Sequence, residues 1–138
     1  MSLNLTPALA QDMLAKYFAE WVRALDLSIV EINAEHAVVR MPMGAHLQRV
    51  GGIVSGQALA ALADTAMVFA AIAHADEFKP FATTDLHTQF LRPGVGRAVL
   101  CDARVVRAGK SLCFTRAEMT VEDNGKLIST ATATFFAA

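Results

Sequence analysis

The run of residues 51–73 constrains the fold more than any other part of the chain. It opens with a glycine-rich turn, continues as a stretch rich in alanine and leucine, and carries one acidic residue, Asp64. Alanine and leucine are strong helix formers, so we predict a helix that starts at about Ser55. A helix that is apolar on every side is expected to be buried on every side. Asp64 would then lie inside the protein, where an unpaired carboxylate is costly, so it needs a structural or chemical reason.

The residues before this run predict an amphipathic helix and a strand hairpin. Thr6 and Pro7 form a good helix start, because the hydroxyl can cap the helix and proline suits its first position. Apolar residues at three- and four-residue steps predict a helix over residues 7–25, with one face on the core or over a ligand site. Alternating segments predict a hairpin over residues 27–43. The apolar face of the helix comprises Met13, Tyr17, Phe18, Trp21, Val22 and Leu25.

The residues after the run predict a sheet. Four strand-like segments follow, and every connection between them contains glycine, including the strong hairpin signal Asn124-Gly125. We expect these strands to form an antiparallel meander. The order of elements predicts an α+β fold and a single domain over residues 1–138, in which a curved antiparallel sheet wraps around one long central helix. The four segments are residues 81–91, 97–106, 112–121 and 127–136.

The composition limits the classes of function. A formal net charge of −1 without a cluster of lysine and arginine argues against a nucleic-acid partner. Hydrophobic residues make up 54% of the 138 residues, so we expect apolar surface to be hidden in an oligomer. Cys101 and Cys113 form neither a disulfide framework nor a metal-binding spacing, so we expect two buried free thiols and no metal site.

The location of the protein is predicted from two further features. Residues 1–6 lead into an amphipathic segment rather than an apolar signal core, so we expect no secretion signal and a reducing, cytoplasmic location. The apolar run over residues 58–73 is shorter than the roughly 20 residues that a membrane span needs, and it has Asp64 inside it. We therefore expect no membrane association.

Three segments of the chain stand out together: GIVSGQALAALADTA at residues 52–66, ATTDLHTQFLRPG at residues 82–94, and VRAGKSL at residues 106–112. In this order and spacing they resemble the hotdog-fold acyl-CoA thioesterases, in the branch of the phenylacetate-pathway thioesterases. The resemblance covers most of the chain, from about Leu27 to its end. It implies a hotdog fold that hydrolyses an acyl- or aryl-CoA thioester to a carboxylic acid and free coenzyme A. Coenzyme A would be part of the substrate, and no other cofactor would be needed.

The resemblance implies roles for the turn and the helix. In that family the turn reads His-Gly-Gly, and an acid follows the middle glycine by eight positions. Here Ser55, Gly56 and Gln57 occupy the turn, and Asp64 keeps the spacing. By resemblance, the N–H of Gly56 binds the thioester carbonyl oxygen, and Asp64 is the nucleophile or the base that activates water. General physical chemistry agrees, because a helix N-terminus suits a developing oxyanion and a poorly solvated carboxylate can act near neutral pH.

The same resemblance adds candidates around the acyl group. The family's upstream asparagine falls at Arg49, with Gln48 beside it, and these two side chains and Gln57 are candidate substrate contacts. Thr83 matches a position where serine or threonine hydrogen-bonds the catalytic acid or water. Ser55 is expected to cap the helix or to take part in the chemistry.

The cationic turn formed by Arg107, Gly109 and Lys110 matches a segment that lies near the coenzyme A nucleotide in relatives. His46 and His87 are weaker candidates for the pocket. Structural interpretations stand beside these roles. Asp64 could be a buried acid satisfied by hydroxyls such as those of Thr65, Thr83 and Thr84, and the cationic turn could be a solvated hairpin.

The spacing of Gly56 and Asp64 bears on assembly. Eight helical residues separate them, which is roughly 12 Å along the axis, so both cannot touch one carbonyl from the same helix. Two antiparallel helices from two chains would bring one chain's Gly56 beside the other's Asp64. The resemblance implies the same arrangement, a homodimer or homotetramer with the site at the subunit interface.

The sequence leaves two other functions open. One is a hotdog dehydratase or hydratase that acts on acyl carrier protein thioesters, although its usual histidine is missing from the turn. The other is a non-catalytic acyl-CoA-binding hotdog protein, which the loss of His-Gly-Gly favours. Release of free thiol from a panel of acyl-CoA compounds separates the three.

Overall fold

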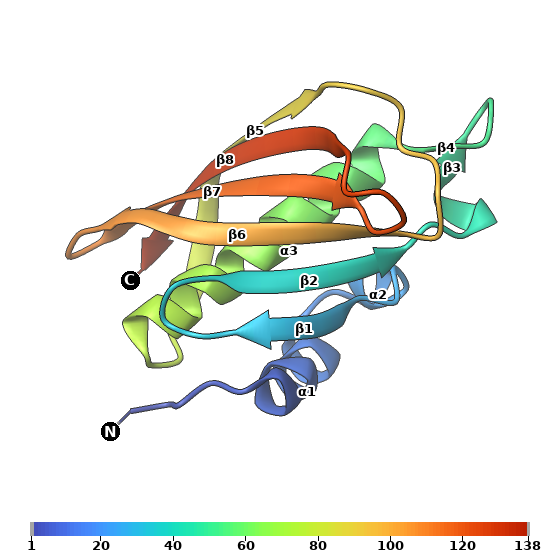
Figure 1. Cartoon of the computed structure of the whole chain (residues 1–138). Helices are drawn as coiled ribbons and strands as arrows, with labels where there is room; N and C mark the ends of the chain where they lie inside the picture. The colour runs from blue at the N-terminus through green and yellow to red at the C-terminus, as the bar shows by residue number, and fades with distance from the viewer. Residues whose placement is uncertain (1, 138) are drawn as a thin grey trace.

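A six-stranded antiparallel sheet curves around one long helix in the computed structural model, which describes residues 2–137 (Figure 1). The helix, α3, spans Gly56–Ala75 and lies against the inner face of the sheet. This is the hotdog arrangement, and the predicted α+β fold is confirmed. In spatial order the strands are β1 (Ser28–Ile32), β2 (Ala37–Pro42), β6 (Ala98–Ala108), β7 (Leu112–Val121), β8 (Leu127–Ala137) and β5 (Phe81–Phe90).

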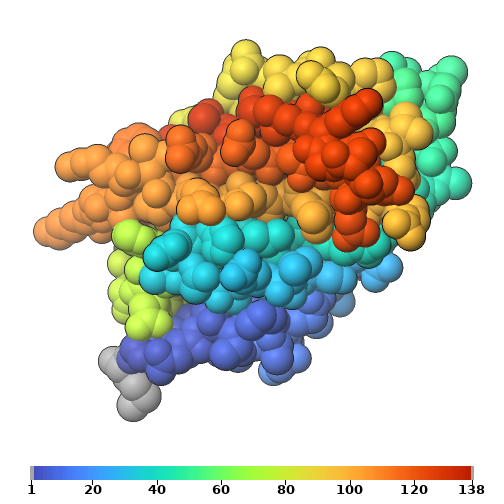
Figure 2. Space-filling model, in the orientation of Figure 1, coloured from blue at the N-terminus to red at the C-terminus, as the bar shows by residue number. Residues whose placement is uncertain are grey.

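Shorter elements complete the chain. Two helices, α1 (Pro7–Tyr17) and α2 (Glu20–Arg23), lie beside β1 at one edge of the sheet. A 3-10 turn, η1 (Ala45–Leu47), leads into a small hairpin at the start of α3. Figure 2 shows the outer face of the sheet, with β5 along the upper rim and the small hairpin projecting at one end. The hairpin consists of β3 (Gln48–Arg49) and β4 (Ile53–Val54).

The core lies between α3 and the inner face of the sheet. Leu62, Met67 and Phe69 of α3 are fully buried there, as the apolar run predicts. By length and composition α3 could also cross a membrane, but 67% of its apolar window is buried inside the protein. Its apolar character is therefore accounted for by the core.

One side of α3 is not covered, which corrects the prediction that the helix is buried all round. The uncovered side begins at the exposed Gln57 and continues through four partly exposed residues, Ala60, Ala61, Asp64 and Val68. These positions recur at three- and four-residue steps, so they form one stripe along the helix. A single curved sheet covers only part of a helical cylinder. Asp64 is accordingly half-buried rather than fully enclosed.

The N-terminal helix is interrupted, which corrects the prediction of one helix over residues 7–25. The start is as predicted, since Thr6 Oγ1 accepts a hydrogen bond from the N–H of Leu9 at 3.1 Å. The chain becomes extended at Phe18 (φ −91°, ψ 154°), and the Phe18 ring stacks on Phe69 with centroids 5.2 Å apart. This break leaves two residues of the predicted apolar face exposed, Tyr17 and Trp21.

The order of the last four strands is not a simple meander. Two of the predicted hairpins are present, β6–β7 and β7–β8, but β5 pairs with β8 at the far edge. β6 instead pairs with β2, so residues 91–97 cross the end of the sheet. There the carbonyl of Gly94 accepts a hydrogen bond from the N–H of Val54 at 3.1 Å. β5 is consequently an edge strand, and most of its side chains are exposed.

Candidate active site

The start of α3 carries free hydrogen-bond donors. Ser55 is the N-cap, and its Oγ accepts a hydrogen bond from the N–H of Ala58 at 3.3 Å. Within residues 2–137, no acceptor takes the N–H of Gly56. The first N–H groups of a helix lack intrahelical partners and carry the positive end of its dipole. Gly56 therefore presents a donor suited to an oxygen that becomes negative.

A cavity of about 310 Å³ lies beside Gly56. The Phe90 ring borders it, and a Cβ atom built on Gly56 would lie 3.0 Å from that ring. A side chain at position 56 would therefore force Phe90 to move, and glycine keeps the backbone N–H open to a ligand. The walls are mainly apolar, with two arginines, and comprise Arg49, Ile53, Val54, Gly56, Leu59, Phe90, Leu91, Arg92, Pro93 and Gly94.

Asp64 is held from the neighbouring edge strand. Thr83 Oγ1 donates a hydrogen bond of 2.9 Å to Asp64 Oδ1, and no described residue donates to Oδ2. Burial raises the pKa of the Asp64 carboxyl above its ordinary value, and the Thr83 hydrogen bond partly offsets that increase. A partly buried carboxyl group with a raised pKa is typical of a residue that transfers protons or attacks a substrate.

The other hydroxyls near Asp64 are engaged elsewhere. Thr65 donates to the carbonyl of Ala61 at 2.8 Å, and Thr84 donates to the carbonyl of Thr134 at 3.0 Å. Only one of the three threonines considered from the sequence therefore contacts the acid.

Gly56 and Asp64 do not meet within one chain. Both lie on α3, and eight residues of helix separate them, which is about 12 Å along the axis. Asp64 does not line the cavity beside Gly56. A single chain therefore holds the free N–H of Gly56 and the carboxylate of Asp64 apart, in two separate places along α3.

The remaining candidates near the turn are scattered. Arg49 lines the cavity with Gly56, whereas Gln48 lines a separate cavity of about 40 Å³. Gln57 is exposed on the first turn of α3, and His46 is exposed in η1. His87 lines a cavity on the outer face of the sheet, on the opposite side from Asp64. Of these candidates, only Arg49 lines the cavity beside Gly56.

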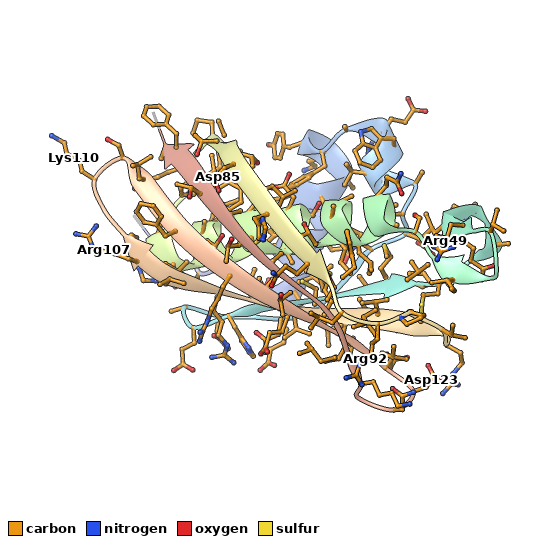
Figure 3. All side chains as sticks on the ribbon, turned by 90° about the horizontal axis from the view of Figure 1, so that it is seen from above. Arg49, Asp85, Arg92, Arg107, Lys110 and Asp123 are labelled. Carbon is orange, nitrogen blue, oxygen red and sulfur yellow. The ribbon has the colours of Figure 1, made fainter. Side chains whose placement is uncertain are left out.

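The predicted cationic turn lies at the other end of the molecule. Gly109 and Lys110, in the turn between β6 and β7, line a cavity of about 250 Å³. Arg107 is exposed beside it. Figure 3 shows Arg107 and Lys110 at one end and Arg49 at the other, where α3 begins. The cavity also includes His74 from the last turn of α3 and Lys79 from the loop that follows it.

Sequence reasoning missed several lining residues. His74 and Lys79 lie far from the cationic turn along the chain, so no local pattern links them to it. Phe90 and Arg92 lie within residues 82–94, one of the segments that resemble the family, and this resemblance could have pointed to them. Whether they line the cavity depends on where β5 ends, which the sequence does not show.

Comparison with known proteins identifies the family of the chain and agrees with the fold. The family model of the thioesterase superfamily matches residues 51–128, more than half of the chain. A protein from Thermoplasma acidophilum, whose given name suggests an esterase, is 25% identical over 130 residues. The match covers 89% of this chain and 93% of the relative.

Solved structures show the same fold. The conserved protein PA5202 from Pseudomonas aeruginosa is 29% identical, with a TM-score of 0.81, over 88% of this chain and 95% of its own. The thioesterase HI1161 from Haemophilus influenzae is 19% identical, with a TM-score of 0.88, and the match covers 100% of this chain and 95% of that protein. The PaaI protein of the E. coli phenylacetic acid degradation operon is 21% identical, with a TM-score of 0.83, and the match covers 99% of this chain and 96% of that protein.

Proposed function

The chain belongs to the thioesterase superfamily, and on that premise we propose that it hydrolyses an acyl- or aryl-CoA thioester to a carboxylic acid and free coenzyme A. One observation carries the proposal. Asp64 is half-buried, has a raised pKa and is held by Thr83, at the family spacing from the unpaired N–H of Gly56.

Each group has a defined task in this reaction. The N–H of Gly56 donates to the carbonyl oxygen of the thioester and stabilises the negative charge that develops there. Asp64 either takes a proton from the attacking water or attacks the carbonyl carbon itself, after which water cleaves the anhydride. In both routes the C–S bond breaks and the sulfur leaves as the thiol of coenzyme A. Water is the second substrate, and we propose no cofactor beyond the coenzyme A of the substrate.

We propose that the site is completed in a homodimer, or in a homotetramer built from two such dimers. Ala60 lies midway between Gly56 and Asp64 on the uncovered stripe of α3. A two-fold axis beside Ala60 would place Gly56 of one protomer next to the partner's Asp64. The exposed edge strand β5 supports this arrangement, since Leu86 and Phe90 lie on it with 38% and 55% exposure. An unpaired edge strand is a ready surface for association.

We propose that the nucleotide end of coenzyme A lies at the cavity of about 250 Å³ beside the turn between β6 and β7, at the other end of α3. Asp64 and His74 are ten residues apart, which is about 15 Å along the helix. A thioester at Asp64 would extend its pantetheine arm toward Lys79 and Lys110, whose ammonium groups suit phosphates. The free, buried thiols of Cys101 and Cys113 are in keeping with a reducing compartment such as the cytoplasm.

Release of free thiol from a panel of aryl- and medium-chain acyl-CoA compounds tests the proposal. We expect hydrolysis of at least one compound well above background. The second candidate is a non-catalytic acyl-CoA-binding protein, favoured by Ser55 and Gln57 in place of the family's histidine and glycine. Tight binding by calorimetry without thiol release across the panel would replace the hydrolase with this candidate.

A further inference from the structure

The cavity beside Gly56 has an unusual distribution of charge. Two of its ten lining residues, Arg49 and Arg92, are cationic, and none is acidic. Six others are apolar, including Leu59 and Phe90. Both arginines are exposed residues, so their guanidinium groups are solvated beside the apolar walls and open to an anionic group of a ligand.

Neither arginine forms an ion pair with any of residues 2–137. The ion pairs among residues 2–137 engage other cations, such as Arg40 with Glu122 and Arg97 with Asp123. Arg49 donates one hydrogen bond of 2.8 Å, from Nη1 to the carbonyl of Val50, which orients its guanidinium and leaves its other donors free. Arg92 precedes Pro93, which restricts its backbone to extended conformations. Both cations are thus available to a ligand.

Their position assigns them to the acyl side of the substrate. Gly56, the proposed donor to the thioester oxygen, lines the same cavity. The phosphates of coenzyme A are separated from the thioester by the whole pantetheine arm. A second cationic group, Arg107 and Lys110, already lies at the far end of the molecule (Figure 3).

We propose that this cavity binds an acyl group with an apolar body and a terminal carboxylate, so that the substrate is the monothioester of a dicarboxylic acid. The inference rests on the proposed hydrolase function and names its substrate class. Arginine is the side chain best suited to a carboxylate, because its planar guanidinium can form two parallel charge-assisted hydrogen bonds. The apolar wall contacts the methylene groups between the thioester and the carboxylate.

A matched pair of substrates tests the inference. Glutaryl-CoA and pentanoyl-CoA have acyl chains of equal length and differ in the terminal group. We expect the wild-type kcat/KM for glutaryl-CoA to exceed that for pentanoyl-CoA by about tenfold or more, as one charge-assisted hydrogen bond implies. Arg49→Gln and Arg92→Gln should each move this ratio toward one. Arg23→Gln, which removes a cation from α2 outside the cavity, should leave the ratio at its wild-type value.

The alternative outcomes are distinct. A wild-type ratio of one or less, with pentanoyl-CoA hydrolysed, overturns the inference and leaves the hydrolase function standing. If the arginine variants lose both substrates equally, and the loss disappears with N-acetylcysteamine thioesters, the arginines bind coenzyme A phosphates and the inference is wrong. If no thioester of any class is hydrolysed, the proposed function fails first. Thermal melts of each variant confirm that the compared proteins are folded.

Discussion

Thr83 on the edge strand β5 donates a 2.9 Å hydrogen bond to Asp64 in the middle of α3. The two residues are 19 positions apart, and this bond ties the exposed edge of the sheet to the uncovered side of the helix. It favours the ionised carboxylate, whereas burial disfavours it. Burial is the larger of the two effects on the pKa of Asp64, and the opposing hydrogen bond comes from a strand that is itself exposed.

Replacing Asp64 by asparagine separates chemistry from structure. Asp64→Asn keeps the shape and an acceptor for Thr83 but removes the charge, so the single-turnover rate should fall by about 10² or more. Substrate binding should survive because Gly56 is untouched. Near-normal turnover in a folded variant would remove Asp64 from the mechanism.

The same variant has a predicted pH signature. The pKa of Asp64 is raised in the folded protein, so the folded state holds its proton more tightly than the unfolded state, whose ordinary value is 3.8. Wild-type stability contributed by this group is thus fully present below pH 3.8 and is lost as the pH rises through the folded pKa. The melting temperature of Asp64→Asn should equal or exceed that of the wild type at neutral pH. Any difference in its favour should disappear at acid pH.

Thr83→Val should shift the pH–rate profile. Loss of the hydroxyl removes the interaction that lowers the pKa of Asp64, so the acidic limb of kcat should move to higher pH. Thr84→Val is the matched control, because the Thr84 hydroxyl bonds the Thr134 carbonyl instead. Equal profiles for the Thr83 variant and the wild type would contradict the assigned role.

Ser55→Ala should lower the free energy of unfolding by about 1 kcal/mol, as the loss of an N-cap typically does. Denaturant unfolding measures this change. Ser55→Thr supplies a replacement capping oxygen and should restore most of the stability. Abolished turnover with stability intact would instead make Ser55 a participant in the chemistry.

Disrupting β5 tests the proposal that two protomers share the site. Leu86→Glu introduces a charge on the exposed edge strand, so light scattering should show a shift toward monomer together with loss of turnover. Val30→Glu, on β1 at the opposite edge of the sheet, should leave both unchanged. A stable, fully active monomer would rule out the shared site.

Lys110→Gln should raise the KM for acyl-CoA by about tenfold, through loss of a charge-assisted contact to phosphate. The same variant should hydrolyse the corresponding pantetheine thioester, which lacks the nucleotide, as well as wild type does. Lys126→Gln, in the turn between β7 and β8, is the control. An equal effect on both thioesters would assign Lys110 to the fold rather than to the nucleotide.

Several features of the fold depend on neighbouring residues and could therefore be predicted from the sequence. The composition of residues 51–73 determined a long core helix, and Ser55 lies at its N-cap as expected. Alternation and glycine-containing turns determined the β6–β7 and β7–β8 hairpins, because both signals act between neighbours in the chain. The spacing of Gly56 and Asp64 followed from helix geometry alone, so their separation was predictable without any tertiary contact.

Tertiary structure decided what depends on distant partners. β6 pairs with β2, and β5 pairs with β8 instead of with β6. No pattern within either strand indicates which partner it will have. The N-terminal helix breaks at Phe18, and the Phe18 ring stacks on Phe69, a contact between residues 51 positions apart. The same long-range pairing leaves one stripe of α3 open, places Thr83 against Asp64, and brings Arg92 to the cavity of Gly56. These outcomes reflect packing between segments that are far apart in sequence, where periodicity and propensity carry no information.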